Sequence, residues 1–208
     1  MKINLIFFLP TFIFGGAGNS IYRLCSRLDK KKYNIYVISI GRCYFRKKLK
    51  KHCKEIFELK ASRVLFSIFM LRSIVSKIYQ KFPQKTIFIS NQHYANVVSL
   101  ISLRGLKFVK IILVDRIDII ELKRYYTFFK FLKNIIIYYL CSLFYRYADA
   151  VVSNSKSAKN DLQKLCKIKV ININPPSLLK LRIKVKTAVY FIIGFMLFKR
   201  RFGLIHRY

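Results

Sequence analysis

Short apolar runs alternate along the chain with segments in which apolar residues recur every three or four positions. A continuous apolar run is typical of a strand buried on both faces, and the wider spacing is typical of a helix with one buried stripe. The first run, 2–9, is followed by a glycine-containing segment and then by a helical stripe of Ile21, Leu24, Cys25 and Leu28. The chain is therefore predicted to begin with a strand, a glycine loop and a helix.

The same alternation continues to residue 173. It predicts strands at 2–9, 33–40, 55–59, 86–90, 108–114, 150–153 and 169–173. It predicts later helices at 63–82, 94–103, 119–147 and 156–165, with a break allowed in the long third one, and a basic loop or short helix at 42–54. Strands that alternate with helices form a parallel sheet covered on both faces, so the predicted fold is a doubly wound, Rossmann-like α/β domain.

The composition supports a folded domain and excludes several classes of protein. Of the 208 residues, 54% are hydrophobic and 24% are charged, which excludes wholesale disorder. Glycine and proline are too scarce for collagen or a low-complexity linker. The five cysteines form no Cys-x-x-Cys pair, and carboxylates are few, so no metal site, cofactor or disulfide framework is expected. Buried thiols in a reducing compartment are the expectation.

The charge is strongly positive. With 41 Lys+Arg against 8 Asp+Glu, the formal net charge is +33. Such a charge favours anionic partners, namely a lipid headgroup surface, a phosphorylated acceptor or nucleic acid. A genome rich in A and T also inflates the lysine content, which is an alternative explanation. The basic residues are spread over nearly every predicted element and no nucleic-acid motif occurs, and both observations count against a nucleic-acid-binding module. Such a module is kept as one alternative function, and a non-catalytic membrane-associated protein is the other.

No segment is expected to span a membrane. The N-terminal apolar run is interrupted by Pro10 and leads through glycines into a helix, so it is interpreted as a strand and not as a signal peptide. The apolar stretches 134–145 and 187–198 are shorter than the roughly 20 residues that a spanning helix needs. The basic, aromatic segments 42–54 and 123–146 either pack as ordinary elements or rest on anionic lipid. The expected location is the cytoplasm, with peripheral attachment to the inner face of the cell membrane.

Three glycines between the first strand and the first helix are candidate binding residues. Gly15, Gly16 and Gly18 let the backbone approach a ligand closely, and the following helix offers free N–H groups to an anion. Ser20 is predicted to cap that helix. The segment matches neither the dinucleotide-binding nor the P-loop pattern, so a tight turn is the alternative interpretation.

Other polar candidates follow later strands, where ligands bind in a doubly wound fold. His93 comes after the fourth strand. It is a candidate base or a candidate hydrogen-bond donor to a sugar or phosphate, and an ordinary loop residue is the alternative interpretation. Asp115, Arg116 and Asp118 come after the fifth strand, where three charges either face a cleft or form an Asp–Arg pair.

The sixth predicted strand is followed by a run of serines. Ser153 and Ser155 are candidate binding residues, and either Ser155 or Ser157 is predicted to cap the next helix. No Ser/His/Asp set can be assembled from the sequence, so no catalytic residue is assigned.

Taken in order, several of these segments resemble the N-terminal domain of a family-4 glycosyltransferase of the GT-B fold. The resemblance covers residues 1–178 and rests on GGAGNSIYRLCSRL, YNIYVISI, VDRID, YADAVVSNSKSAKNDL and VININPP. It implies two doubly wound domains that transfer a sugar from a nucleotide sugar, with retention, the N-terminal domain shaping the acceptor side. It also implies that the glycine loop lies near the donor diphosphate and the acceptor.

The resemblance further implies a role in polysaccharide biosynthesis for the cell envelope. VDRID is similar to a strand end in a subgroup that acts on lipid-linked or cell-surface glycans, with Asp115 and Ile117 in place of the subgroup's Glu and Asn. Those substitutions put the role of this strand end in question.

Residues 179–208 do not continue the resemblance. We interpret them as a linker and an aborted start of the second domain, which in the family holds most contacts to the nucleotide sugar. Reading one base forward from Met196 reaches K-E-D-L-D-L-F-I, which resembles the family's K-x-x-D-L-L-I stretch. The hypothesis is therefore a truncated product of a frameshifted gene, with an incomplete nucleotide-sugar site and little or no transferase activity.

Overall fold

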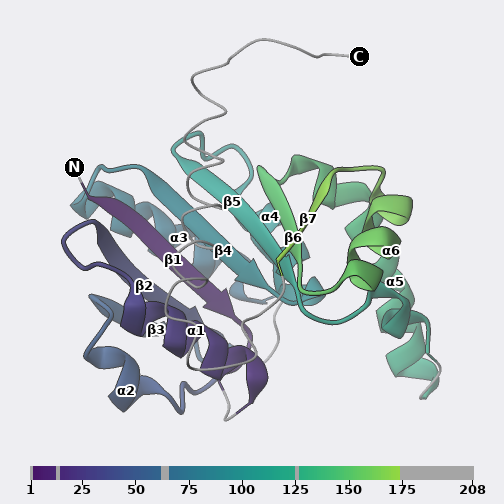
Figure 1. Cartoon of the computed structure of the whole chain (residues 1–208), viewed down its shortest axis with the longest axis horizontal. Coiled ribbons are helices and arrows are strands. Elements are labelled where there is room, and N and C mark those ends of the chain that lie inside the picture. Colours follow the sequence, from purple (N-terminus) through teal and green to yellow (C-terminus); the bar gives the residue numbers. More distant parts are fainter. Residues whose placement is uncertain (1, 13–14, 62–65, 125–126, 174–208) are drawn as a thin grey trace. The chain divides into compact units, whose positions relative to one another are not determined.

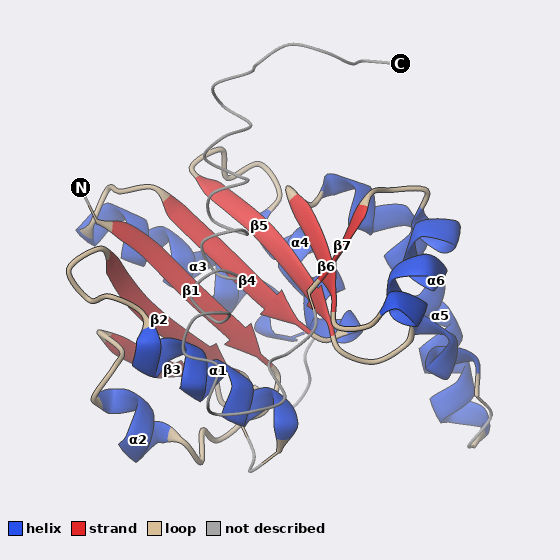
Figure 2. Ribbon diagram, in the orientation of Figure 1, coloured by secondary structure: helices blue, strands red, loops and turns tan. Residues whose placement is uncertain are grey.

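Seven parallel strands form one sheet in the order β3-β2-β1-β4-β5-β6-β7 (Figure 2). The strands are β1 (Ile3–Leu9), β2 (Tyr33–Ser39), β3 (Glu55–Glu58), β4 (Thr86–Asn91), β5 (Val109–Asp115), β6 (Ala150–Ser153) and β7 (Val170–Asn172). The structure is a computed structural model, and it describes residues 2–12, 15–61, 66–124 and 127–173. Because β1 pairs with both β2 and β4, the strand order reverses between β1 and β4, which is where doubly wound domains bind ligands.

Helices cover both faces of this sheet. They are α1 (Gly16–Arg27), α2 (Arg46–Lys50), α3 (Ser67–Lys81), α4 (His93–Leu103), α5 (Phe128–Phe144) and α6 (Lys156–Cys166), with short 3-10 helices η2 (Ile119–Lys123) and η3 (Tyr145–Tyr147). Figure 1 shows α1 in front of the sheet and α3 behind it. This arrangement confirms the predicted doubly wound, Rossmann-like α/β fold.

The central strands are buried along almost their whole length, as their continuous apolar runs predict. All seven residues of β2 are buried, as are the last six of β1. The buried polar exceptions include Asn4 and Asn34, which are in register on adjacent strands, and Asn34 Nδ2 donates to Asn4 Oδ1 at 3.1 Å. Asn4 Nδ2 donates in turn to the carbonyl oxygen of Phe82 at 2.9 Å. These bonds satisfy polar groups at the amino edge of the sheet, opposite the candidate residues.

Two details of the helices differ from the sequence prediction. Helix α1 begins at Gly16, and Gly15 takes the N-cap position with extended backbone, so Ser20 lies inside the helix and does not cap it. The amide of Asn19 already donates to the carbonyl of Gly15, which closes the first turn before Ser20. The predicted helix 119–147 is broken into η2, α5 and η3, which is the break that the sequence allowed.

The helix formed by α5 and η3 is longer than the apolar stretch 134–145 from which its length was judged in the sequence. This helix covers Phe128–Tyr147, 20 residues with a mean hydropathy of 1.3, and it is long and apolar enough to cross a membrane by length and composition. The sequence estimate counted only the stretch between Lys133 and Arg146, whereas the helix starts five residues before Lys133. The stretch 187–198 and the predicted second-domain start, 179–208, lie outside the described residues.

Candidate functional site

The candidate residues lie at the carboxyl edge of the sheet, after strands that are neighbours. The segment with Gly15 follows β1, His93 follows β4, Arg116 follows β5 and Ser155 follows β6. Since β1, β4, β5 and β6 are adjacent and parallel, their carboxyl ends share one edge. The structure therefore brings together the segments that the sequence analysis singled out one by one.

The glycines form the start of a helix and not a loop ahead of it. No described side chain caps α1, and its first turn contains no acidic residue, so its first N–H groups carry the positive end of the helix dipole uncompensated. A Cβ atom added at Gly16 would meet no described atom within 4 Å, whereas Gly18 is buried. Open space therefore adjoins the backbone at Gly16, as close approach of a ligand requires.

His93 and Asp115 form a buried ion pair beneath this edge. The distance from His93 Nδ1 to Asp115 Oδ1 is 2.8 Å, and His93 Nε2 lies 3.0 Å from the carbonyl oxygen of Ile117. Both ring nitrogens thus face acceptors, which favours the doubly protonated imidazolium. Burial lowers the pKa of His93, but the charge of Asp115 and the two hydrogen bonds outweigh it and raise the pKa above its usual value. These contacts therefore stabilise the protonated form of His93 inside the domain.

Two further side chains complete this polar cluster. Asn96 Nδ2 donates to Asp115 Oδ1 at 2.8 Å, and the hydroxyl of Tyr145 donates to the same oxygen at 3.1 Å. Burial, followed by the charge of Asp115, raises the pKa of Tyr145 well above its usual value. Asp115 Oδ2 and Asn96 Oδ1 have no partner among the described residues. Through the three partners of its Oδ1 atom, Asp115 fixes the end of β5 against the domain core.

Arg116 does not form the Asp–Arg pair that the sequence allowed, because Asp115 points into the core toward His93. Instead, Arg116 Nε donates to Asn91 Oδ1 at 3.1 Å, and Asn91 Nδ2 donates to the carbonyl oxygen of Phe8 at 3.2 Å. Arg116 is half-buried, and this burial lowers its pKa. Within the described part of the chain it makes no ion pair. Asn91 thus connects the guanidinium of Arg116 to the end of β1.

The serines after β6 hold backbone in place. Ser155 caps α6, its Oγ accepting a hydrogen bond from the amide of Ala158 at 3.0 Å, which confirms one of the two predicted caps. Ser153 is buried and donates to the carbonyl oxygen of Ser155 at 3.0 Å. Ser155 Oγ also lies 3.5 Å from Asp118 Oδ1, which links the loops after β5 and β6.

Four residues of this edge were not predicted from the sequence, namely Asn91, Asn96, Tyr145 and Asn154. Asn154 Nδ2 donates to the carbonyl oxygen of Arg116 at 3.0 Å, and so fixes the backbone beside the cation. Asn91 directly follows the predicted strand 86–90, which was the one available signal. Within the described ranges, no group of three or more His, Cys, Asp or Glu side chains could hold a metal ion.

Comparison with solved structures identifies similar folds. They include a sucrose-phosphate synthase from Thermosynechococcus elongatus (TM-score 0.59, 8% identity), a glycosyltransferase from Rickettsia africae (0.57, 17%) and the Anabaena protein HepE in complex with UDP and glucose (0.55, 16%). Each match covers 92% of this chain. The match covers 99% of the synthase chain but 50% of each of the other two, so this chain spans about half their length. A sequence search finds no match among curated proteins.

The family assignment comes from the sequence. Residues 14–174 match the model of Glycosyltransferase Family 4, a range that includes the whole candidate edge from Gly15 to Ser155. The doubly wound sheet is similar in fold to half of the glycosyltransferase from Rickettsia africae. The chain therefore belongs to glycosyltransferase family 4, and its described residues form the N-terminal domain of the GT-B architecture.

Proposed function

We propose that this chain takes part in transferring a sugar from a nucleotide sugar, with retention of configuration, to a lipid-linked or cell-surface glycan. In this proposal the described domain shapes the acceptor side and helps to bind the phosphates of the donor. The product belongs to the polysaccharides of the cell envelope, and the protein works in the cytoplasm at the inner face of the membrane. Family membership supports the sugar transfer, and the five free cysteines, four of them buried, fit a reducing compartment.

Arg116 is the observation that carries the proposal. A half-buried guanidinium costs solvation free energy, and no carboxylate among the described residues compensates its charge. Asn91 holds it beside the ends of β1 and β4, where the strand order reverses. A phosphate or carboxylate of a ligand supplies the missing charge, and a planar guanidinium binds such groups through paired hydrogen bonds.

The amino end of α1 adds a second feature suited to an anion. It follows β1, in which the carbonyl oxygen of Phe8 is joined to Arg116 through Asn91. Free N–H groups at a helix start bind phosphate well, and the open space at Gly16 lets a ligand reach them. We therefore assign the diphosphate of the donor, or an anionic group of the acceptor, to the region between Gly16 and Arg116.

Calorimetric titration of the full chain with UDP, ADP and a short polyprenyl diphosphate tests this proposal. Saturable binding of at least one of these probes is expected. Gly16→Leu fills the open space and is expected to weaken binding about tenfold or more, which corresponds to about 1.4 kcal/mol. Asn19→Leu, at an exposed position one turn further along α1, is the matched control and is expected to bind normally. Equal binding by both variants would contradict the assignment.

The alternative function, nucleic-acid binding, is favoured by the charge of +33 alone. Titration of single-stranded RNA at several salt concentrations tests it in the same samples. Steep salt dependence together with no binding of any diphosphate probe would replace the glycosyltransferase proposal.

A further inference from the structure

One face of α5 and η3 is apolar and exposed to solvent. We call it the apolar stripe, and it consists of Phe129, Leu132, Ile136, Tyr139, Leu143 and Tyr147. These residues are three or four positions apart, so they share one side of the helix. The side chain of Phe129 is 82% exposed, and the other five are each about half exposed. A stripe of this length on a folded domain marks an interaction surface.

Cations flank the apolar stripe, and of these Arg124 is paired with Glu121 at 3.1 Å. The sequence has no Asp or Glu between Leu122 and Ala148, a stretch that contains Lys123, Arg124, Lys130, Lys133 and Arg146. Lys133 Nζ lies 4.6 Å from the ring centre of Tyr94, next to α5, and the guanidinium carbon of Arg146 lies 5.7 Å from the ring of Tyr147. The surface is therefore apolar in the middle and positive at its margins.

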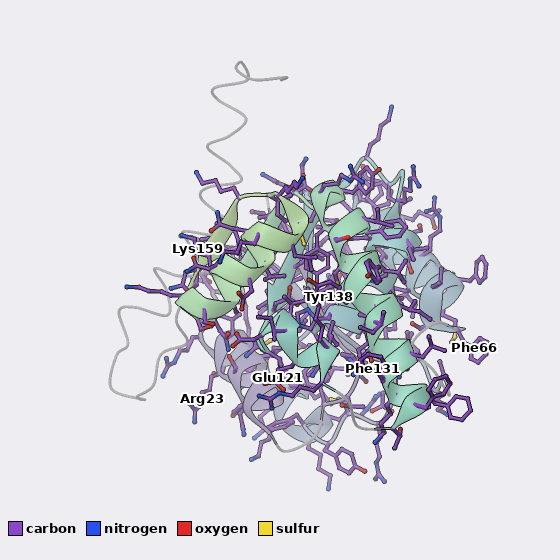
Figure 3. All side chains as sticks on the ribbon, turned by 90° about the vertical axis from the view of Figure 1, so that its right-hand side faces the viewer. Arg23, Phe66, Glu121, Phe131, Tyr138 and Lys159 are labelled. Carbon is purple, nitrogen blue, oxygen red and sulfur yellow. The ribbon has the colours of Figure 1, made fainter. Side chains whose placement is uncertain are left out.

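The connections of α5 exclude a membrane crossing, although its length would allow one. The chain enters α5 from β5 through η2 and leaves it for β6, and β5 and β6 are paired neighbours. Cys141 and Tyr145 are fully buried in the domain core, so one side of the helix is packed against protein. Figure 3 faces α5 and α6, with Phe131 and Tyr138 labelled on α5. The helix can lie on a membrane surface but cannot leave the domain to span it.

The charge decides between two occupants of the apolar stripe. A second copy of the chain would place the same cations against one another, and each copy carries a net charge of +33. A bilayer with anionic lipids offers an apolar interior under a negative surface, which matches both parts of this face. We propose that α5 lies in the surface of an anionic lipid bilayer, with the apolar stripe inserted below the headgroups and the flanking cations on the phosphates.

This membrane surface is separate from the candidate binding edge and does not depend on sugar transfer. η2 follows the loop after β5 and precedes α5 in the chain, so α5 is connected to the same edge of the sheet as Arg116. Docking through α5 would therefore hold that edge close to the bilayer, where a lipid-linked acceptor is located. Membrane binding can be measured without any nucleotide, so its failure and the failure of the proposed function are distinguishable.

Flotation of the full chain with vesicles tests the inference. Vesicles of phosphatidylcholine containing phosphatidylglycerol are expected to carry the protein upward, and vesicles of phosphatidylcholine alone are expected to bind far less. The double variant Phe129→Ser, Leu132→Ser is expected to lower the partition coefficient at least about tenfold, because it removes two large apolar side chains. Tyr44→Ser changes an exposed aromatic residue in the segment 42–54, the other segment that the sequence allowed to rest on lipid, and is expected to float like the natural chain.

Charge reversal provides the second arm. Lys130→Glu with Lys133→Glu is expected to lower binding to anionic vesicles at least about tenfold. Lys47→Glu with Lys48→Glu makes the same change in net charge on α2, near the opposite end of the sheet, and is expected to have a smaller effect (Figure 1). Thermal unfolding checks that each variant is folded. If the stripe variant, Phe129→Ser with Leu132→Ser, is unfolded, Tyr139→Ser is used in its place.

Three results would overturn the inference. The first is binding that is equal for the stripe variant and the natural chain, and the second is no binding to anionic vesicles at all. The third is a dimer in analytical ultracentrifugation that the stripe variant dissociates, which would assign the apolar stripe to self-association.

Discussion

The imidazole atom Nδ1 of His93 lies 2.8 Å from the carboxylate atom Oδ1 of Asp115, with both side chains buried. The pair ties the first turn of α4 to the last residue of β5. Replacing His93 by Gln leaves the charge of Asp115 buried without a cation, which typically costs about 3 kcal/mol or more. We expect a loss of that size in the free energy of unfolding, measured by urea denaturation.

The double variant His93→Gln, Asp115→Asn is the control for this prediction. Because it removes both charges, it is expected to be more stable than His93→Gln alone. If His93→Gln destabilised the protein by less than about 0.5 kcal/mol, which is the scale of a typical surface substitution, the buried ion pair would be contradicted.

The ion pair also predicts how stability depends on pH. The pKa of His93 is raised above its ordinary value of 6.5, so the folded protein binds this proton more tightly than the unfolded chain. The stabilisation is fully present below about pH 6.5 and is lost as the pH rises through the folded pKa. Urea unfolding at several pH values should show the difference between the natural chain and His93→Gln shrinking above about pH 6.5. A difference that grows with pH would contradict the charged state assigned to His93.

Gln92 has a backbone conformation that glycine adopts more easily. Its φ is 79° and its ψ is 143°, directly between β4 and α4 at the candidate edge. A residue with a side chain is strained in this region, and glycine is not. Gln92→Gly is expected to stabilise the protein by about 1 kcal/mol after the entropy cost of glycine is subtracted, measured by thermal unfolding. Unchanged or lower stability would show that the Gln92 side chain makes a compensating contribution.

The fold could be predicted from the sequence because its strands are buried on both faces. A residue run such as 2–9 has few polar positions, so its strand character does not depend on partners elsewhere in the chain. The start of α1 was missed because Gly15 provides no cap side chain, and capping signals in sequence depend on side chains. The orientation of α5 was left open, since aromatic residues on all its sides do not reveal which side meets the core.

The candidate edge could be predicted only as a set of segments. Their position after parallel strands follows from topology, and the structure confirms it. The individual roles depend on contacts between residues far apart in sequence. His93 contacts Asp115, 22 positions later in the sequence, and Arg116 contacts Asn91, 25 positions earlier. Neither pairing leaves a periodic signal, so the sequence could not distinguish a buried ion pair from an exposed binding group.

The most direct test of the account is the affinity of the full chain for UDP with and without the guanidinium of Arg116. Arg116→Gln is compared with Arg23→Gln, which removes the same charge from an exposed position on α1. The account predicts that Arg116→Gln weakens UDP binding at least about tenfold, because it removes a partly desolvated phosphate contact, while Arg23→Gln changes it little. Equal affinities for the two variants, or no binding of UDP, ADP or the polyprenyl diphosphate by the natural chain, would contradict the assignment of this edge to a diphosphate.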